Sequence, residues 1–178
     1  MYKVEALALE GCKLITPSIT EDVRGKVIKP FQCEGFREIG IEAEFTEDLV
    51  VFNKERVLRG MHFQAEPYAQ EKLVYCLQGK IRDILLDLRR DSPTFAQHIS
   101  IELTGTALKM LYVPKGIAHG YYCMLPSVVC YKLSSFYSKE HERGIAWDCC
   151  GVNWIDLNPI ISEKDKSYPS LSTYIEQH

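Results

Sequence analysis

Residues 72–88 have the sequence KLVYCLQGKIRDILLDL, in which two runs of β-forming residues flank a short turn. Gln78 and Gly79 supply the turn, since glycine favours a break between strands. Apolar and polar residues partly alternate in the second run, Ile81–Leu88, so one face is expected to pack inward while the other carries polar groups. The stretch therefore predicts two consecutive strands, Lys72–Leu77 and Ile81–Leu88, of an all-β fold.

Short runs of the same kind extend over most of the chain. The other expected strands are Lys13–Ile15, Phe45–Phe52, Val57–Phe63, His98–Leu103, Ala107–Val113, His119–Met124 and Val128–Leu133. Helix is expected only as a short piece near Cys33–Ile39 and as a turn or two after Ser162. Many short strands separated by turns are typical of a jelly-roll β-sandwich, here with short peripheral helices. No repeat or flexible linker interrupts the pattern, so we predict a single domain over residues 1–178.

The composition is that of an ordinary globular protein. The 178 residues are 46% hydrophobic and 25% charged with a net charge of -3, so nothing favours nucleic acid or a membrane surface as a partner. Met1–Pro17 lacks the pattern of a signal peptide, and no apolar run could span a bilayer. The seven cysteines include no Cys-x-x-Cys spacing, which favours reduced thiols and a cytoplasmic location. The adjacent pair Cys149–Cys150 has no functional interpretation at this level.

Three clusters contain residue types suited to chemistry. They are Arg59–Gln64 (RGMHFQ), Pro114–Gly120 (PKGIAHG), and Tyr131–Lys132 with Tyr137–Gly144. In a regular strand Arg59 and His62 face opposite sides, so a shared face requires a twist or a bulge. The second cluster is a turn that delivers His119 onto the following strand.

The first two clusters resemble the two-motif layout of cupins. Metal-binding cupins usually have two histidines separated by one residue, then a glutamate, then the histidine of the second motif. Position 64 is glutamine here, and Glu66 falls too early to replace the missing carboxylate. His62 and His119 therefore lack an obvious third ligand, and no metal or other cofactor is expected.

Further segments, taken in order, resemble the dTDP-4-dehydrorhamnose 3,5-epimerase family. The matching segments cover the chain from about residue 12 to residue 171, and they are Asp22–Gly25, Val57–Gln64, Gln70–Val74, Asp87–Phe95, Val113–Gly120, Tyr137–Trp147 and Ile161–Asp165. Any one segment is a weak signal, whereas the ordered set is specific. The resemblance implies a cupin-type jelly-roll homodimer in which the N-terminal strand region completes the neighbouring subunit's site.

The resemblance also implies a reaction that needs no metal or organic cofactor. The family's substrate is a nucleoside-diphosphate sugar with a ketone at C4, so the hydrogens at C3 and C5 are both acidified. Removal of one gives an enolate, and return of the proton to the opposite face inverts the carbon. Such chemistry requires a base, a stabiliser for the enolate oxygen and an acid on the far face.

Four residues match the family's catalytic groups. His62 matches the base, which suits a side chain that titrates near neutral pH. Asp165 matches the carboxylate that orients this base. Lys72 matches the cation that faces the developing enolate, and Tyr131 matches the proposed acid.

Seven further residues are candidates for binding the substrate: Arg24, Lys29, Glu47, Arg59, Gln64, Asp83 and His119. Arg24 and Arg59 match diphosphate contacts, because a guanidinium fork suits phosphate geometry. His119 and Asp83 match a second histidine–carboxylate pair in the pocket. Gln64 belongs to the matching segment Val57–Gln64 and is included with them.

The sequence departs from the family on the nucleotide side. Where the family has a glutamate that meets thymine, this chain has Lys29, and Glu47 and Leu49 replace the usual Gln and Asn. The usual Gly before the catalytic lysine is Glu71. Because lysine only donates hydrogen bonds, Lys29 would prefer a base edge that accepts them, as cytosine and guanine do. One hypothesis is therefore a CDP- or GDP-linked sugar in place of a dTDP-linked one; alternatively Lys29 points to solvent.

Three alternatives stay open from the sequence. One is a sugar ketoisomerase on a related cupin scaffold, which would move the carbonyl instead of only inverting carbon and whose motifs fit this chain less well. A metal-dependent cupin oxygenase or isomerase would bind a transition metal, against which the missing third ligand argues. A non-catalytic sugar-nucleotide-binding cupin would be expected to lack part of the catalytic set. Outside this motif set, His62 would be interpreted as an ordinary strand histidine and Asp165 as a helix-capping carboxylate.

Overall fold

A computed structural model describes residues 2–177, so Met1 and His178 of the expected domain lie outside the described residues. The strands are β1 (Lys3–Ala6), β2 (Lys13–Thr16), β3 (Ile19–Asp22), β4 (Gly25–Ile28), β5 (Glu47–Asn53), β6 (Leu58–Gln64), β7 (Lys72–Gln78), β8 (Lys80–Asp87), β9 (His98–Thr104), β10 (Met110–Val113), β11 (Ile117–Cys123), β12 (Ser127–Leu133) and β13 (Glu142–Gly144). The helices are α1 (Cys33–Glu38), α2 (Glu163–Lys166) and α3 (Leu171–Gln177).

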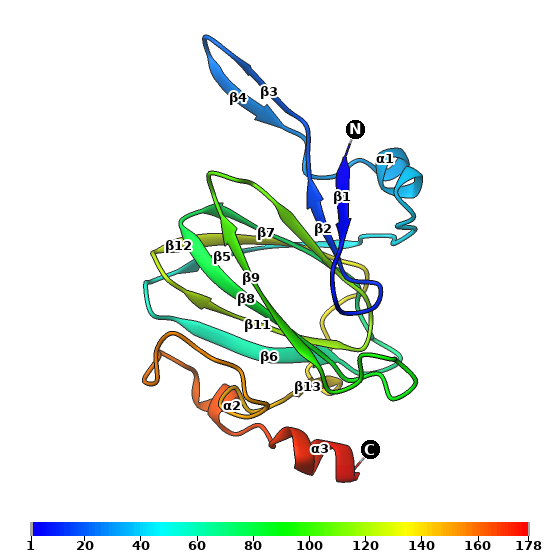
Figure 1. The fold of residues 1–178 in the computed structure, drawn as a ribbon, viewed down its shortest axis with the longest axis vertical. Helices are drawn as coiled ribbons and strands as arrows, with labels where there is room; N and C mark the ends of the chain where they lie inside the picture. The colour runs from blue at the N-terminus through cyan, green and yellow to red at the C-terminus, as the bar shows by residue number, and fades with distance from the viewer. Residues whose placement is uncertain (1, 178) are drawn as a thin grey trace.

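Two antiparallel sheets form the body of the molecule (Figure 1). One has six strands in the order β1-β2-β10-β7-β12-β5, and the other has five in the order β13-β6-β11-β8-β9. The predicted pair of strands at residues 72–88 is β7 and β8, which the turn at Gln78–Gly79 sends into different sheets. The expected all-β jelly-roll sandwich is thus confirmed.

Alternation along the strands builds the core between the sheets. Val74 and Leu111 from the six-stranded sheet are fully buried in one cluster with Ile81 and Leu85 from the five-stranded sheet. Burial of such side chains is the main favourable term in folding, at roughly 25 cal/mol per Å² of apolar surface.

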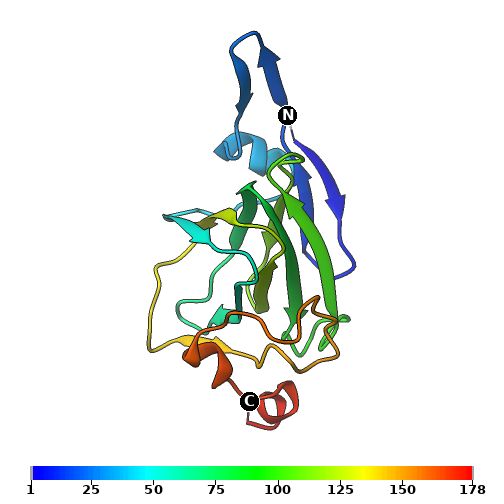
Figure 2. The ribbon, with the colours of Figure 1, turned by 90° about the vertical axis from the view of Figure 1, so that its left-hand side faces the viewer.

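The C-terminal segment covers the outer face of the five-stranded sheet, where α2 and α3 lie (Figures 1 and 2). Met61 and Phe63 of β6 pack there against Trp154, with Leu171 and Tyr174 of α3 at the edge of the cluster. This cover matters for the site because α2 carries Asp165.

The hairpin of β3 and β4 projects away from both sheets (Figure 1). Its two strands pair with each other, and almost every residue in them is exposed, including Val27. The sequence did not predict these strands, because the hairpin has no apolar face that packs on its own subunit. Strands β1 and β13 and helix α3 were also missed.

The predicted strand Ala107–Val113 is shorter than expected. The chain turns at residues 104–108, where the Leu108 N–H donates to the Thr104 carbonyl and Leu108 has a φ of 49°. Since a left-handed residue cannot continue a strand, β10 begins only at Met110.

No helix among residues 2–177 is long and apolar enough to cross a membrane.

Candidate active site

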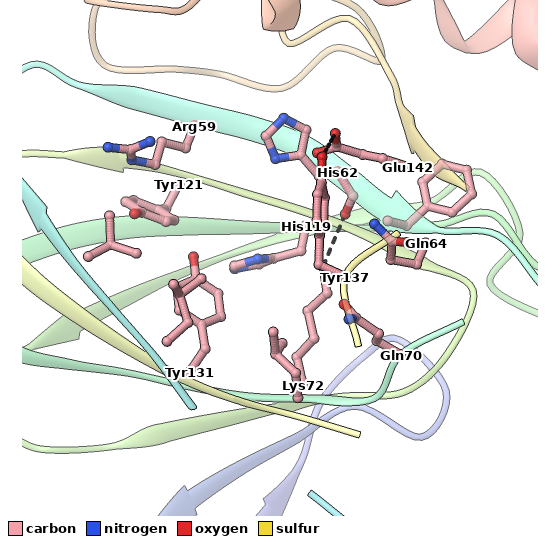
Figure 3. Close-up of a pocket in the computed structure, with 14 residues that line it drawn as sticks. Arg59, His62, Gln64, Gln70, Lys72, His119, Tyr121, Tyr131, Tyr137 and Glu142 are labelled. Atoms are coloured by element: carbon pink, nitrogen blue, oxygen red, sulfur yellow. Dashed lines mark hydrogen bonds between the residues drawn. The ribbon is translucent and has the colours of Figure 1, made fainter. Parts of the chain in front are cut away.

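A pocket of about 240 Å³ opens between the two sheets (Figure 3). Strands β5, β7 and β12 of one sheet, β6, β11 and β13 of the other, and the loops before β7 and β13 supply its walls. The lining side chains are Leu49, Val51, Arg59, His62, Phe63, Gln64, Gln70, Lys72, His119, Tyr121, Tyr131, Leu133, Tyr137 and Glu142.

A β-bulge brings Arg59 and His62 into the same pocket. His62 lies opposite His119 on β11, whereas Arg59 lies opposite Tyr121, so β6 has one residue more than its partner over this interval. Gly60 sits in the bulge with a φ of 125°, and a Cβ there would lie 2.5 Å from the Gly120 Cα. Only glycine allows this close approach, which is how the shared face anticipated from the sequence is achieved.

His62 and Asp165 form a hydrogen-bonded pair across the fold. The His62 Nε2 lies 2.9 Å from Asp165 Oδ1, and the Gly60 N–H donates to Asp165 Oδ2 at 3.1 Å. Ser162 caps α2 by accepting from the Asp165 N–H, which fixes the carboxylate in the first turn. Burial acts to raise the pKa of Asp165, but the hydrogen bond and charge of His62 outweigh it and hold that pKa below its usual value.

The His62 ring is also held by an aromatic neighbour. Tyr168 meets it edge-on with the ring centroids 5.6 Å apart. Gly144 leaves room for Tyr168, because a Cβ at that position would lie 2.5 Å from the tyrosine ring. The histidine is therefore fixed by Asp165 on one ring nitrogen and by a packed ring beside it.

Lys72 brings a buried cation to the same pocket. It is only 8% exposed, and its Nζ donates to the His62 carbonyl at 3.2 Å. Burial lowers the pKa of Lys72 to about 8, an effect that the nearby Asp83 and Glu142 carboxylates partly oppose. At neutral pH the ammonium is charged and sheltered from bulk water.

His119 and Asp83 form a second pair, deeper than the first. His119 Nε2 lies 2.9 Å from Asp83 Oδ2, and Asp83 is completely buried. Burial raises the pKa of Asp83, while the charges of His119 and Lys72 oppose the rise. Asp83 is thus behind His119 and does not itself line the pocket.

Tyr131 lies on β12, on the sheet opposite His62. Its ring meets His119 edge-on at 5.8 Å and lies 6.5 Å from the ring of Tyr121. Burial raises the pKa of Tyr131 well above its ordinary value, and the nearby Tyr121 and Asp83 add to the rise. The phenol therefore stays protonated at any physiological pH.

Arg59 lies at one end of the pocket and is held by a residue that the sequence did not single out. The Asn53 Oδ1 accepts from Arg59 Nε at 2.8 Å and from the Tyr121 hydroxyl at 3.4 Å. The Asn53 amide donates in turn to the Val51 and Ser127 carbonyls. This arrangement fixes the guanidinium and leaves its two terminal nitrogens for an anionic group.

Other lining groups were not assigned a role from the sequence. Glu142 accepts from the Tyr137 hydroxyl at 2.9 Å (Figure 3). It also accepts from Lys164 Nζ at 2.8 Å. Burial favours a higher pKa for Glu142, but these hydrogen bonds lower it on balance. Tyr137 and Glu142 both belong to the third cluster of the sequence, and their position in it was the only indication that they would lie at the site. The predicted Gln64 does line the pocket, and its Oε1 accepts from the Ser138 N–H.

Four predicted binding residues do not line this pocket, namely Asp83, which lies behind His119, and Arg24, Lys29 and Glu47. Arg24 is at the tip of the projecting hairpin, where its exposed side chain pairs with Asp22. Lys29 lies just after β4, beside a separate hollow that it shares with Tyr2. Glu47 is at the pocket's edge, where its carboxylate accepts from the Tyr137 N–H at 3.4 Å.

The side chains of the pocket do not provide the set of ligands that a bound metal ion requires. Across residues 2–177, no group of three or more His, Cys, Asp or Glu side chains is placed to hold an ion. His62 and His119 each use one ring nitrogen on a carboxylate, and the lining position 64 offers an amide.

The chain is similar to proteins of known function over most of its length. A family model described as dTDP-4-dehydrorhamnose 3,5-epimerase matches residues 6–173. The enzyme of that name from Shigella flexneri is 39% identical over 157 residues, which are 85% of this chain and 86% of that protein.

Two crystal structures have nearly the same fold as this chain. The Bacillus anthracis dTDP-4-dehydrorhamnose 3,5-epimerase with TDP and PPi bound is 35% identical with a TM-score of 0.93, covering 96% of this chain and 100% of the other. A Legionella pneumophila 3,5-epimerase in complex with dTDP-4-keto-L-rhamnose is 30% identical with a TM-score of 0.92, covering 97% and 94%.

Proposed function

The chain belongs to the dTDP-4-dehydrorhamnose 3,5-epimerase family, and on that premise we propose that it inverts carbons beside the ketone of a nucleoside-diphosphate 4-keto-6-deoxy sugar. It is an isomerase-class enzyme of deoxysugar biosynthesis. One observation supports the proposal above the others: His62, paired with Asp165 of α2, faces the pocket from the five-stranded sheet, and Tyr131 faces it from the six-stranded sheet. A sugar between the sheets would have a base on one face and an acid on the other.

His62 removes the proton in this proposal. Asp165, whose pKa is lowered, is ionised and can only accept, so His62 Nε2 carries the hydrogen of their bond. The other ring nitrogen, Nδ1, is then free to take the proton from the sugar carbon. The carboxylate also stabilises the imidazolium that forms.

Lys72 stabilises the enolate, and Tyr131 completes the inversion. A fixed ammonium in a sheltered site favours negative charge on the C4 oxygen as it develops. The phenol of Tyr131 then returns a proton to the face opposite His62. His119, fixed by Asp83, also lines the pocket beside Tyr131 and offers a further hydrogen-bonding group to the sugar.

Arg59 binds the diphosphate in this proposal, and the projecting hairpin completes the nucleotide end in a homodimer. The hairpin presents Arg24 and Lys29 away from the pocket of its own subunit. Apolar side chains are exposed on the outer face of the six-stranded sheet, notably Phe52 at 76% and Leu77 at 52%. Apolar exposure of this kind on one sheet suits association with a second copy. Arg24 would then reach the neighbour's substrate.

Deuterium exchange from heavy water tests the catalytic proposal. The protein is incubated with dTDP-, CDP- and GDP-linked 4-keto-6-deoxy sugars, and the label is located at C3 and C5. Label at both carbons supports a 3,5-epimerase, and label at one supports a single-centre enzyme. His62→Ala should abolish exchange while nucleotide binding is retained. Absence of exchange from folded protein that still binds nucleotide would favour the non-catalytic alternative.

The same assay tests the base hypothesis and the homodimer. If Lys29 selects cytosine or guanine, Lys29→Glu should shift the preference toward the dTDP sugar. Equal turnover of all three, unchanged by this substitution, would contradict the hypothesis. Mixing inactive His62→Ala chains with Arg24→Ala chains should restore activity, because half of the sites in a mixed dimer would combine an intact pocket with an intact hairpin. A lack of recovery in dimers shown to be mixed would argue against a shared site.

A further inference from the structure

Two adjacent cysteines on the segment after β13 have their thiols in contact. The Sγ atoms of Cys149 and Cys150 are 2.8 Å apart, and both side chains are partly exposed. Cys33, in contrast, is a lone exposed thiol, and Cys12 is buried in the core. The pair is therefore both accessible and already arranged for a reaction between its members.

The backbone at this pair has an unusual conformation. Cys150 has a φ of 70° and Gly151 follows with a φ of 69°. A left-handed conformation is uncommon for a residue other than glycine, and it concentrates at functional sites. Adjacent Cα atoms are about 3.8 Å apart across a trans peptide, below the usual range for a disulfide, so a bond between neighbours is strained and easily reduced. Such disulfides are reversible ones.

The two thiols differ in acidity in the way that exchange requires. A hydrogen bond from Cys150, with help from the Leu171 backbone and against the effect of burial, lowers the pKa of Cys149 to about 7. The same hydrogen bond and burial raise the pKa of Cys150. Cys149 is thus partly a thiolate at neutral pH, the form that attacks disulfides, while Cys150 holds its proton until the second step.

This pair is linked to the segment that carries the catalytic carboxylate. The Cys149 thiol donates to the Ala146 carbonyl at 2.9 Å, and the Ala146 N–H donates to the Pro169 carbonyl at 2.8 Å. Tyr168, which packs on His62, immediately precedes Pro169, and Asp165 lies one turn earlier. Ala146 is thus hydrogen-bonded both to Cys149 and to the segment that carries the two supports of the His62 ring.

We propose that Cys149 and Cys150 form a thiol–disulfide site that reacts with a low-molecular-weight disulfide of the glutathione class, and that closing the bond displaces the Tyr168–Asp165 support of His62. In the first step, the Cys149 thiolate attacks one sulfur of the small disulfide, forming a mixed disulfide and releasing one thiolate. Cys150 then loses its proton and attacks Cys149 Sγ, which releases the second thiolate. The protein loses two hydrogen atoms, and the small disulfide is reduced to two thiols.

Mass spectrometry of the intact chain tests the chemistry. Cys33→Ser serves as the background, because it removes the lone exposed thiol without touching the pair. After treatment with oxidised glutathione, this variant should lose the mass of two hydrogens without a lasting adduct, and dithiothreitol should reverse the change. A further Cys150→Ser change should trap a glutathione adduct on Cys149, whereas Cys149→Ser should stop the reaction at this site. Stable adducts with the pair intact, or loss of two hydrogens in either serine variant, would overturn the proposal.

Activity tests the link to His62, which rests on the proposed function. Oxidation should lower deuterium exchange about tenfold, since misplacing a catalytic group by around 1 Å costs up to about a hundredfold. Reduction should restore the rate, and the Cys150→Ser variant measured before and after treatment provides the comparison for an adduct alone. A disulfide that forms without changing exchange would overturn the link. Absence of exchange in the reduced protein would instead contradict the proposed function. The mass measurement would still show whether Cys149 and Cys150 form the disulfide.

Discussion

Replacing Lys72 with arginine is expected to remove the alkaline limb of the pH–rate profile. Burial lowers the pKa of Lys72 to about 8, so the wild-type protein loses this cation above that pH. A positive charge beside the C4 oxygen is needed to stabilise the enolate, so turnover should fall with it. Each pH unit above 8 should reduce kcat/KM about tenfold, because the charged fraction falls by that factor. Arginine stays charged throughout, so its residual activity should show no such fall.

The same burial predicts a pH dependence of stability that needs no substrate. Both the folded and the unfolded states are protonated below pH 8, so the full cost of burying the charge is present there. Between pH 8 and 10.5 the unfolded state binds more protons, and stability contributed by this group rises with pH. A shift of this size corresponds to about 3 kcal/mol. Lys72→Met should remove this rise and stabilise the protein at pH 7 by about 2 kcal/mol, since the lost hydrogen bond to the His62 carbonyl costs about 1 kcal/mol.

Two measurements decide this prediction. The first is kcat/KM for deuterium exchange from pH 6 to 10, compared between wild type and Lys72→Arg, and the second is urea unfolding of wild type and Lys72→Met over the same range. An alkaline limb with an unchanged midpoint in Lys72→Arg would refute the assignment of Lys72. Unfolding free energies that run parallel in wild type and Lys72→Met would refute the buried charge itself.

The remaining predictions concern the orientation of the site. Asp165→Asn should lower exchange at least about a hundredfold, because an amide neither fixes the His62 tautomer nor stabilises the imidazolium; nucleotide binding measured calorimetrically should be unchanged, and exchange near the wild-type rate would contradict the pairing. In steady-state kinetics, Asn53→Ala should raise KM about tenfold with little effect on kcat, since Arg59 loses a charge-assisted hydrogen bond. A fall in kcat without a change in KM would count against this role of Asn53. Tyr131→Phe should slow inversion more than it slows loss of the substrate's α-hydrogens, and equal slowing of both, followed by NMR, would exclude Tyr131 as the far-face acid.

The outline of the fold could be predicted from residue pattern, although the ends of elements could not. All nine runs marked as strands are strands in the structure, because β-forming residues bounded by turn residues carry a local signal. The hairpin of β3 and β4 was not predictable in this way, since Val27 and its neighbours face solvent in the subunit. The late start of β10 at Met110 depends on the single backbone angle of Leu108, which a leucine in the sequence does not indicate.

The site shows the same division. His62, Lys72, Tyr131 and Asp165 were chosen from motifs in the sequence, and the structure brings all four to one pocket or its immediate support. Asn53 was missed because nothing in its local sequence indicates that it meets Arg59 across the end of the pocket.

The sequence by itself determined which side chains are available, their order on the strands, and the family to which that ordered set belongs. Only the tertiary structure decided how they act together. The bulge at Gly60 turns Arg59 and His62 to one side, and packing of the C-terminal segment brings Asp165 to a histidine more than a hundred residues away. Burial between the sheets then shifts the pKa of Lys72 and of Tyr131. Desolvation and long-range contact are properties of the folded surroundings, so no local pattern of residues can specify them.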